Sequence, residues 1–492
     1  MPSLSGAQAN AVAEMIRITP VVDRLGGLFA AAGHELHLVG GPVRDALLGR
    51  LGHDLDFTTD ARPEQIEPLL REFIITGDRG SAVWDIGRAF GTIGAKLVEP
   101  AGGDDAEGRA WVVEVTTYRS DTYEETSRKP AVAFGDTLAG DLRRRDFTVN
   151  AMAISCADKT FTDPYGGLSD LAASRIRTPA TAEQSFSDDP LRMMRAARFV
   201  AQLGFTADPS VVEAMTAMAD RIDIISAERV HDELTKLLLA DNPRPGLNLL
   251  VQTGLAERVL PELPALRLER DEHHRHKDVY EHSLTVLEQA IDLEKSRGHQ
   301  PDLVNRIAAL LHDIGKPRTR RFESGGKVSF HHHDVVGAKL VSKRMKALKF
   351  STEQIKAVAL LVELHLRFHG YGEGQWTDSA VRRYVRDAGD QLERLHILTR
   401  ADCTTRNQRK AARLRNAYDD LERRIAQLAE QEQMDALRPD LDGAEIMAVL
   451  GIEPGPTVGR AYKHLLELRI DHGPLGPERA RAELLDWWSR QS

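Results

Sequence analysis

The 492-residue chain is too long for one hydrophobic core, so we expect about two to four domains. Apolar residues make up 42% and charged residues 28%, which excludes a wholly disordered chain, and the 5% of aromatic residues goes with a mostly helical protein. The formal net charge of −9 argues against a protein that binds nucleic acid over its whole surface, although short basic stretches occur.

The cysteines and the apolar runs bear on the cellular compartment. Cys156 and Cys403 are too few for a disulfide framework, which fits a reducing cytosol. No apolar run has the length of a membrane span, and the N-terminus has no signal-peptide pattern. We therefore expect a cytoplasmic protein without a membrane partner.

The patterns along the chain divide it into four regions. Strand and helix patterns alternate over residues 20–155, with strands expected at HELHLV, FIITG, WVVEVTTY and NAMAIS. Helical patterns fill 156–265, and they resume over 275–402 together with most of the remaining histidines. Residues 403–492 form a charged helical tail, expected to pack on the preceding region. We expect the His-rich stretch from His273 to His276 to be an exposed linker.

Two carboxylates stand one residue apart in the stretch HDLDF. Residues i and i+2 of a strand project from the same face, so Asp54 and Asp56 stand side by side while Leu55 points into the core. Like charges at that separation raise each other's pKa unless a cation lies between them. Mg²⁺ prefers carboxylate and phosphate oxygens, and a pair of such ions can activate a hydroxyl and neutralise a leaving pyrophosphate. A lone Asp-x-Asp is more often a solvated strand end. The neighbouring motifs are therefore needed to distinguish a metal site from a solvated strand end.

Two neighbouring features fit a metal-dependent reaction on phosphates. Gly40 and Gly41 precede a short helix, and their lack of side chains would let a triphosphate approach backbone N–H groups. A third carboxylate should come from an adjacent strand, and Glu114 is the candidate because Val112, Glu114 and Thr116 share one face. An ordinary cross-strand contact is an equally good interpretation of Glu114.

Five motifs in order carry a resemblance to a known family: LVGGPVRDALLGR…HDLDFTT, VEVTTYR, LRRRDFTVNAMA, DPYGGLSDL and DDPLRMMRAARF. From about Leu38 to Leu263 the chain resembles the bacterial CCA-adding enzyme and poly(A) polymerase family of nucleotidyltransferases. The resemblance implies an α+β protein with a small polymerase-β-like head on a mixed sheet over 20–155, followed by an elongated all-α neck. One departure is Asp188, where the family usually has Glu.

The resemblance also implies roles for individual residues. Asp54 and Asp56 would bind Mg²⁺ and, with Glu114, form the catalytic carboxylates. Arg145, Asp146 and Asn150 would contact the triphosphate and ribose of the incoming nucleotide. The full set of nucleotide-binding candidates is Gly40, Gly41, Arg44, Arg145, Asp146, Asn150, Asp189, Arg192, Arg195 and Arg198.

Asp189 and Arg192 offer a way to select the base. They lie three residues apart, on one face of an expected helix start, and they supply one acceptor and one donor group. Cytosine and adenine both present an exocyclic amine beside a ring acceptor, so one Asp–Arg pair can serve both. Guanine and uracil would place a carbonyl oxygen against the carboxylate, and leaving such groups unpaired is costly. The alternative is a structural ion pair three residues apart.

The second half of the chain carries a separate set of metal-ligand candidates. His282, the adjacent His312 and Asp313, and Asp402 occur in the order typical of an HD-type metal phosphohydrolase domain, which this part resembles over 275–402. Imidazole with carboxylate suits a divalent transition metal such as Mn²⁺, Ni²⁺, Co²⁺ or Fe²⁺. His333 and His365 could contact a substrate phosphate or a second metal, although each alone is more often a surface histidine.

These observations predict a CCA-adding tRNA nucleotidyltransferase that adds CMP and AMP from CTP and ATP to the tRNA 3′ end, with an HD domain that hydrolyses phosphate esters. A poly(A) polymerase or an enzyme that adds only A remains an alternative, because the Asp–Arg pair accepts A in each. A second alternative is an HD phosphohydrolase with an inactive RNA-binding head. Both a monomer and a homodimer fit the sequence.

Overall fold

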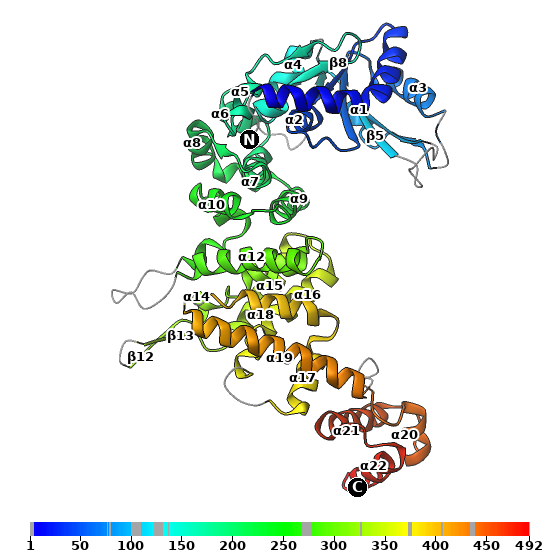
Figure 1. The fold of residues 1–492 in the computed structure, drawn as a ribbon, viewed down its shortest axis with the longest axis vertical. Helices are drawn as coiled ribbons and strands as arrows, with labels where there is room; N and C mark the ends of the chain where they lie inside the picture. The colour runs from blue at the N-terminus through cyan, green and yellow to red at the C-terminus, as the bar shows by residue number, and fades with distance from the viewer. Residues whose placement is uncertain are drawn as a thin grey trace. The chain divides into compact units, whose positions relative to one another are not determined.

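The computed structural model describes residues 4–75, 77, 80–99, 110–122, 131–135, 137–267, 278–324, 327–371, 376–404, 407–432 and 438–491. The chain divides into two compact units, Met1–Val259 and Leu260–Ser492, of which the first holds a mixed sheet and the second is mainly helical (Figure 1). The predicted α+β class is confirmed. The stretch from His273 to His276, expected to be a linker, lies outside the described residues.

A seven-stranded sheet in the order β3-β4-β5-β2-β1-β8-β9 forms the centre of the first unit. Its strands are β1 Leu36–Val39, β2 Asp54–Thr59, β3 Ala82–Trp84, β4 Thr92–Val98, β5 Ala110–Thr117, β8 Ala153–Ser155 and β9 Phe161–Thr162. Strands β2 and β5 pair in parallel, whereas the other pairs are antiparallel. The parallel register places Asp56 opposite Glu114.

Short helices and small strands surround this sheet. They are α1 Leu4–Ala31, α2 Gly41–Leu47, α3 Pro63–Ile74, η1 Arg88–Phe90, β6 Arg119–Thr122, β7 Ala131–Phe134, α4 Leu138–Arg143, η2 Thr148–Asn150, α5 Gly167–Ala172, β10 Arg175–Ile176 and β11 Thr206–Ala207. Helix α1 contacts β1, and α3 contacts β4 and β5. The alternation along β2 buries Leu55 and Phe57, each 1% exposed, and leaves the other face of that strand to polar residues.

The strand expected at FIITG is wrong, because Phe73 and Ile74 end helix α3. Ile66, Leu70 and Phe73 recur at helical spacing and are fully buried. Pro63 occupies the first turn of this helix, where its missing N–H costs nothing. The helical period therefore extends through an apolar run that looks like a strand in isolation.

Helix α7 is the centre of the remaining helices of the first unit, where it contacts α6, η3, α9 and α10. These remaining helices are α6 Ala182–Asp188, α7 Leu191–Leu203, α8 Pro209–Ala217, η3 Ala219–Ile224, α9 Ala227–Leu238, α10 Arg244–Gln252 and α11 Ala256–Val259. Nearly every side chain of α7 is buried, because α9 and α10 cover it. Two arginines of α7, Arg192 and Arg198, are among these buried side chains.

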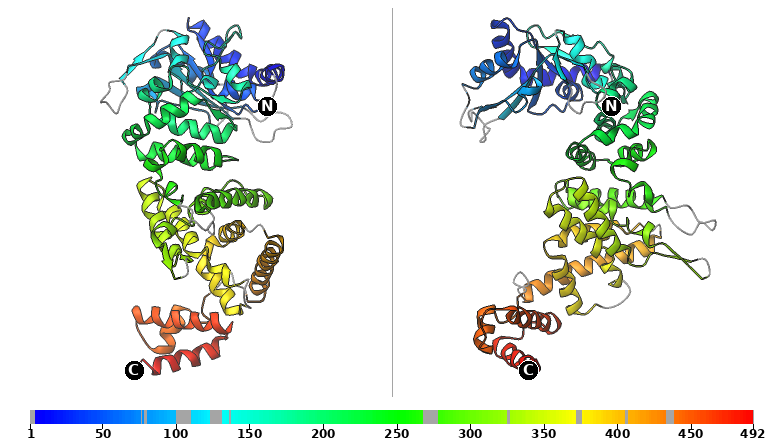
Figure 2. Two further views of the ribbon diagram at one scale, coloured as in Figure 1. Left: turned by 90° about the vertical axis from the view of Figure 1, so that its left-hand side faces the viewer. Right: turned by 180° about the vertical axis from the view of Figure 1, so that it is seen from behind.

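The second unit consists of helices and one small hairpin. Its elements are η4 Pro264–Leu266, α12 Val279–Ser296, α13 Leu303–Leu311, α14 Lys316–Thr319, β12 Arg321–Glu323, β13 Lys327–Ser329, α15 His333–Ala347, α16 Thr352–Leu364, η5 Arg367–Gly370, α17 Asp378–Ala388, η6 Gly389–Gln391, α18 Leu392–Ala401, α19 Gln408–Glu432, α20 Gly443–Leu450, α21 Pro456–His472 and α22 Pro477–Ser489. Helix α19 packs on α17 and α18, as expected for the charged tail (Figure 2). Helices α20 to α22 share a small core that includes Leu441, Leu465 and Leu484.

No helix among the described residues is both long and apolar enough to cross a membrane.

The close packing of α10 on α7 gives a test of the first unit. A Cβ added at Gly246 would lie 2.4 Å from the backbone oxygen of Ala197, so Gly246→Ala must push the two helices apart. We expect it to destabilise the unit by about 1–3 kcal/mol, measured as a lower midpoint of thermal unfolding. Gly27→Ala is the matched control, because a Cβ there meets nothing within 4 Å. Equal midpoints for the two variants would contradict the packing.

Candidate functional site

Three carboxylates gather on one face of the sheet. Asp54 and Asp56 are exposed on β2, with Leu55 buried between them, and the register sets Glu114 of β5 directly beside Asp56. Although the residue is exposed, partial loss of hydration raises the pKa of Asp56 to about 6, and Arg145 opposes this shift while Glu114 and Asp54 add to it. The face therefore concentrates negative charge that a cation would stabilise.

The turn before α2 brings cationic groups to the same place. Gly40 has φ 74°, a conformation that favours glycine, and a Cβ on it would lie 2.9 Å from Nη1 of Arg145 and 3.9 Å from Oδ2 of Asp56. A Cβ on Gly41 would lie 3.5 Å from Nη2 of Arg44. The absence of side chains at the turn thus leaves room between the carboxylates and two arginines.

A buried carboxylate that the sequence analysis missed holds Arg145. Asp141 is fully buried, and its Oδ2 accepts from Nη2 of Arg145 at 3.1 Å and from the hydroxyl of Thr58 at 3.3 Å. Arg144 donates to the other oxygen. Burial opposes ionisation, but Arg145 and Arg144 hold the pKa of Asp141 below its ordinary value. Its position four residues before Arg145, on the helix α4, was the available signal.

Asp146 and Asn150 join the head to α7. Asp146 accepts from Nε of Arg195 at 2.8 Å and from Nδ2 of Asn150 at 3.0 Å, while Oδ1 of Asn150 accepts from Nη1 of Arg44 at 2.7 Å. Burial acts to raise the pKa of Asp146, but Arg195 and Asn150 keep it well below the ordinary value. The structure therefore brings four predicted residues into one chain of hydrogen bonds.

The arginines of α7 also rely on a second carboxylate that the sequence analysis did not single out. Glu233 of α9 is 3% exposed and accepts from Nε of Arg198 at 2.6 Å, with Nη1 of Arg195 at 3.6 Å. The Arg198 guanidinium also lies 4.1 Å from the ring centroid of Phe199. These contacts fix both side chains before any ligand binds.

Asp189 and Arg192 lie at the start of α7, as expected, and Oδ1 of Asp189 accepts from the backbone N–H of Leu191 at 3.1 Å, but no ion pair joins the two side chains among the described residues. Asp189 has an extended backbone (φ −144°) after α6, and Pro190 separates it from α7. Its Oδ2 accepts from Nη2 of Arg229 at 2.9 Å, whereas Arg192 donates to the Ser185 hydroxyl at 2.9 Å. The structural ion pair between Asp189 and Arg192, offered as the alternative, is thus replaced by separate partners for each side chain.

The second unit brings its six candidate ligands together from helix ends. His282 lies on α12, and His312, His333, His365 and Asp402 lie at or next to the ends of α13, α15, α16 and α18. Two groups of potential metal ligands result, one of His282, His312 and Asp402 and one of Asp313, His333 and His365. His333 and His365, which the sequence left open, belong to this centre.

The imidazoles of this centre are oriented by bonds through Nδ1. Backbone oxygens accept from His312 at 2.9 Å, His333 at 2.8 Å and His365 at 2.6 Å. The Nε2 atoms of these three histidines are buried without a hydrogen-bond partner in the described part of the chain. Buried polar atoms left unpaired are costly, so this arrangement fits metal ligation, in which the Nδ1 bond fixes the free nitrogen.

Asp313 stands between the two groups. Its Oδ2 lies 3.3 Å from Nε2 of His312, and its Oδ1 lies 3.3 Å from Nε2 of His333 and 3.9 Å from Nε2 of His365. Burial alone would lower the pKa of His312, but Asp313 and Asp402 raise it to about 10, whereas burial and His312 lower the pKa of His365 to about 4. One carboxylate thus faces two positions that a cation can occupy.

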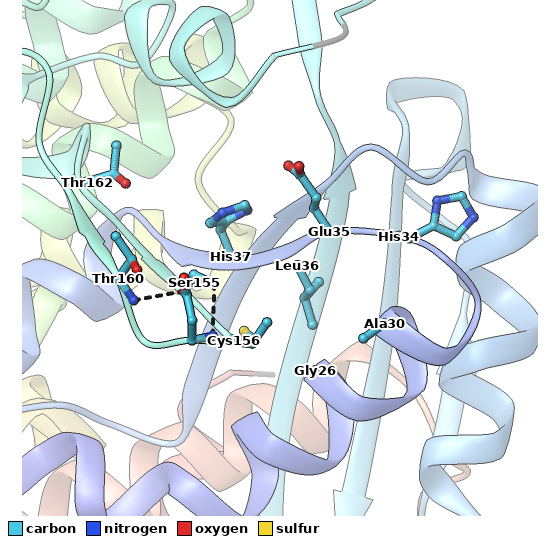
Figure 3. Close-up of a pocket in the computed structure, with 12 residues that line it drawn as sticks. Gly26, Ala30, His34, Glu35, Leu36, His37, Ser155, Cys156, Thr160 and Thr162 are labelled. Atoms are coloured by element: carbon cyan, nitrogen blue, oxygen red, sulfur yellow. Dashed lines mark hydrogen bonds between the residues drawn. The ribbon is translucent and has the colours of Figure 1, made fainter.

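A cavity of about 450 Å³ lies elsewhere in the first unit, at the start of β1 (Figure 3). His34, Glu35, His37 and Cys156 are among its lining residues, and none of the predicted site residues lines it. Burial raises the pKa of the Cys156 thiol to about 12, so the thiol is neutral at physiological pH.

Three family models match the chain along its length. They are described as the poly A polymerase head domain over residues 36–177, the probable RNA and SrmB-binding site of polymerase A over 204–266, and the HD domain over 279–407.

Relatives of similar length match nearly the whole chain. An A-adding tRNA nucleotidyltransferase from Deinococcus radiodurans is 35% identical over 92% of this chain and 95% of its own. A CCA-adding enzyme from Streptococcus thermophilus is 30% identical over 93% of each chain. The chain belongs to the tRNA nucleotidyltransferase family. It is therefore a nucleotidyltransferase, and it carries an HD domain.

Solved structures with the same fold also belong to this family. A CCA-adding enzyme from Bacillus stearothermophilus, in complex with CTP, covers 95% of this chain with a TM-score of 0.61 and 23% identity. A Thermotoga maritima CCA-adding enzyme, complexed with tRNA, covers 96% with a TM-score of 0.58 and 20% identity. These likenesses extend the fold assignment over both units.

The raised pKa of Asp56 predicts a pH-dependent stability in the metal-free chain. The pKa of Asp56 in the folded chain, about 6, lies above the ordinary value of 3.8. The contribution of the protonated carboxyl to the free energy of unfolding is therefore fully present below pH 3.8 and is lost as the pH rises through about 6. Asp56→Asn should therefore raise the unfolding midpoint in EDTA at pH 7.5, and this gain should shrink by pH 5.

The control for this pH test is Asp85→Asn, because Asp85 is an exposed aspartate of the same unit that lies outside the carboxylate cluster. Unfolding midpoints measured from pH 5 to 8 compare the two variants with the unmodified chain. A gain for Asp56→Asn that does not change with pH would contradict the raised pKa of Asp56.

Proposed function

We propose that this nucleotidyltransferase adds CMP and AMP, from CTP and ATP, to the 3′ end of tRNA. The observation that carries the proposal is the alignment of Asp54, Asp56 and Glu114 on one sheet face, opposite Arg145 and the Gly40 turn. The relatives named as A-adding and CCA-adding enzymes support the substrate class. Such a protein would act in the cytosol, as a monomer or a homodimer.

The proposed division of labour follows the four predicted regions. Residues 20–155 would form the nucleotidyltransferase head and 156–265 the neck that recognises the base. Residues 275–402 would form the HD domain and 403–492 the helical tail. The basic first turns of the tail helix α19, with Arg409, Lys410 and Arg413 near its start, would be available to tRNA phosphates.

The carboxylates of the head fit Mg²⁺, because their oxygens lie on one face and the charge is only partly balanced by arginine. When bound, Mg²⁺ lowers the pKa of the tRNA terminal hydroxyl and stabilises the pyrophosphate that leaves. The Gly40–Gly41 turn would admit the triphosphate to backbone N–H groups, and Arg44 and Arg145 would bind its oxygens. Asn150 and Asp146 would position these arginines and the ribose.

Base selection is assigned to the region where α6 meets α7. Asp189 would accept the exocyclic amine of cytosine or adenine, while Arg192 would donate to the neighbouring ring nitrogen. Arg229 would hold the Asp189 carboxylate in place, since it donates to Oδ2 at 2.9 Å. Arg195 and Arg198, fixed by Asp146 and Glu233, would support this surface on α7.

The test uses tRNA that lacks its 3′-terminal CCA and each labelled triphosphate in turn. We expect incorporation of CMP and, after it, of AMP, with UMP and GMP rejected. Arg192→Ala should lose both additions. Asp189→Ala should admit UMP and GMP, because the acceptor that opposes their carbonyl oxygens is gone.

The control for base selection is Asp188→Ala, which removes the carboxylate next to Asp189. The Asp188 carboxylate accepts a hydrogen bond from the Gln184 side chain. Its selectivity should equal that of the unmodified chain. Unchanged selectivity in the Asp189 and Arg192 variants would contradict base selection by this pair. Addition of AMP to tRNA ending in CC, without any addition of CMP, would identify an A-adding enzyme instead.

We further propose that the HD domain hydrolyses phosphate esters with divalent transition metals. Three buried Nε2 atoms that make no hydrogen bond within the described part of the chain, and that lie near the Asp313 carboxylate, favour this second activity. His282, His312 and Asp402 would hold one metal and His333 and His365 another, with Asp313 between them. Such metals, once bound, supply a nucleophilic hydroxide and a Lewis acid for the phosphoryl group.

Metal content tests this second site without any assay of activity. His365→Gln should remove one of the two metal equivalents after loading with Mn²⁺ or Ni²⁺, measured by atomic emission on the full chain. His299→Gln is the control, since His299 lies on the surface with Glu393 at 3.1 Å. Full metal content in His365→Gln would refute the role of His365, and absence of metal from the unmodified chain would refute the site.

A further inference from the structure

A basic hairpin leaves the helices of the second unit between two members of the HD centre. The chain runs from Asp313 through α14 into strands β12 and β13 and returns at His333, the first residue of α15. Figures 1 and 2 show these strands projecting from the helices of their unit. We call residues 316–324 and 327–330 the basic arm.

The outer surface of the basic arm combines unpaired cations with an exposed aromatic ring. Arg318 and Arg321 are exposed, and Arg320 is half-buried. Within the described residues, no carboxylate forms an ion pair with any of these three arginines. Phe322 is 72% exposed, and the Arg320 guanidinium lies 4.8 Å from its ring centroid.

A single exposed aromatic side chain is ordinary on a protein surface, but Phe322 lies beside arginines that form no ion pair among the described residues. The same set of groups is suited to single-stranded nucleic acid, in which bases stack on aromatic rings and phosphates bind arginine. The one acidic strand residue, Glu323, is turned toward a histidine, with Nε2 of His331 at 3.5 Å. The charge of the arm thus favours an anionic partner.

Both ends of the basic arm touch the HD centre. Lys316 donates from Nζ to Oδ2 of Asp313 at 2.6 Å. At the other end, the backbone oxygen of Phe330 accepts from Nδ1 of His333 at 2.8 Å, and the Lys316 ammonium lies 5.7 Å from the Phe330 ring. A chain bound along the arm would therefore meet the centre at the base of the hairpin.

We propose that the basic arm binds the single-stranded 3′ end of an RNA and delivers its terminal phosphate ester to the HD centre. The proposal rests on the phosphohydrolase function proposed above. In the reaction a water oxygen bonds to phosphorus, the bond from phosphorus to a ribose oxygen breaks, and that oxygen takes up a proton. A free nucleotide offers one base and no chain of phosphates, so it would gain little from the arm.

The experiment compares an RNA oligonucleotide ending in a 3′-phosphate or a 2′,3′-cyclic phosphate with the corresponding mononucleotides, using the full metal-loaded chain. We expect kcat/KM to be higher for the oligonucleotides than for the mononucleotides. The combined variant Arg320→Ala, Arg321→Ala, Phe322→Ala should lower the oligonucleotide value by at least about tenfold and leave the mononucleotide value unchanged. Added salt should reduce the oligonucleotide advantage in the unmodified chain.

The control is Arg423→Ala, which removes another exposed arginine of the same unit, 3.5 Å from Asp420. It should leave both values unchanged. Equal hydrolysis of oligonucleotides by the arm variant and the unmodified chain would overturn the arm while leaving the phosphohydrolase in place. If the arm variant keeps its full metal content but loses kcat/KM equally on mononucleotides, the arm only supports the structure of the HD centre. That result would overturn the proposal that the arm binds RNA for the HD centre. Failure of the metal-loaded chain to hydrolyse any of these esters would overturn both proposals.

Discussion

Electrostatic repulsion among carboxylates on one sheet face is the constraint on which the head depends. The parallel pairing of β2 with β5 fixes Asp56 beside Glu114, and the two-residue period of β2 adds Asp54 on the same face. The backbone imposes these positions, so the charges cannot separate. Loss of hydration is the main cause of the raised pKa of Asp56 in the metal-free chain, and repulsion from Glu114 and Asp54 adds to it against the opposing effect of Arg145. A site with this electrostatic character favours divalent cations and the phosphates that accompany them.

Buried carboxylates make the arginines around this face rigid. Asp141, Asp146 and Glu233 are each less than a tenth exposed, and each accepts from an arginine for which we propose a role in nucleotide binding. Prior fixation of the arginines reduces the entropy that binding would otherwise cost. The HD centre differs, because three of its buried Nε2 atoms make no hydrogen bond among the described residues, although oxygens of Asp313 lie 3.3–3.9 Å away. The two units thus present two groups of candidate metal ligands of different chemical type.

The sequence predicted the local geometry of each segment better than it predicted which side chains from distant segments contact one another. The period of HDLDF sufficed to place Asp54 and Asp56 outward and Leu55 inward, because strand alternation needs no tertiary information. The extended backbone of Asp189 follows from Pro190, which disfavours helix at the preceding residue, and the predicted helix start lies directly after it, where Oδ1 of Asp189 accepts from the N–H of Leu191. Arg229 and Glu233 could not be assigned, since they approach α7 only through the packing of α9. His333 and His365 likewise gain significance only from their distances to Asp313.

Anomalous diffraction from crystals grown with Mn²⁺ and a non-hydrolysable CTP analogue tests the metal assignment in the head most directly. The account predicts a manganese peak at coordination distance from both Asp54 and Asp56, next to the analogue's phosphates, and no such peak in Asp56→Asn crystals. A nucleotide bound there without manganese between these two carboxylates, or manganese confined to the histidine centre, would contradict it.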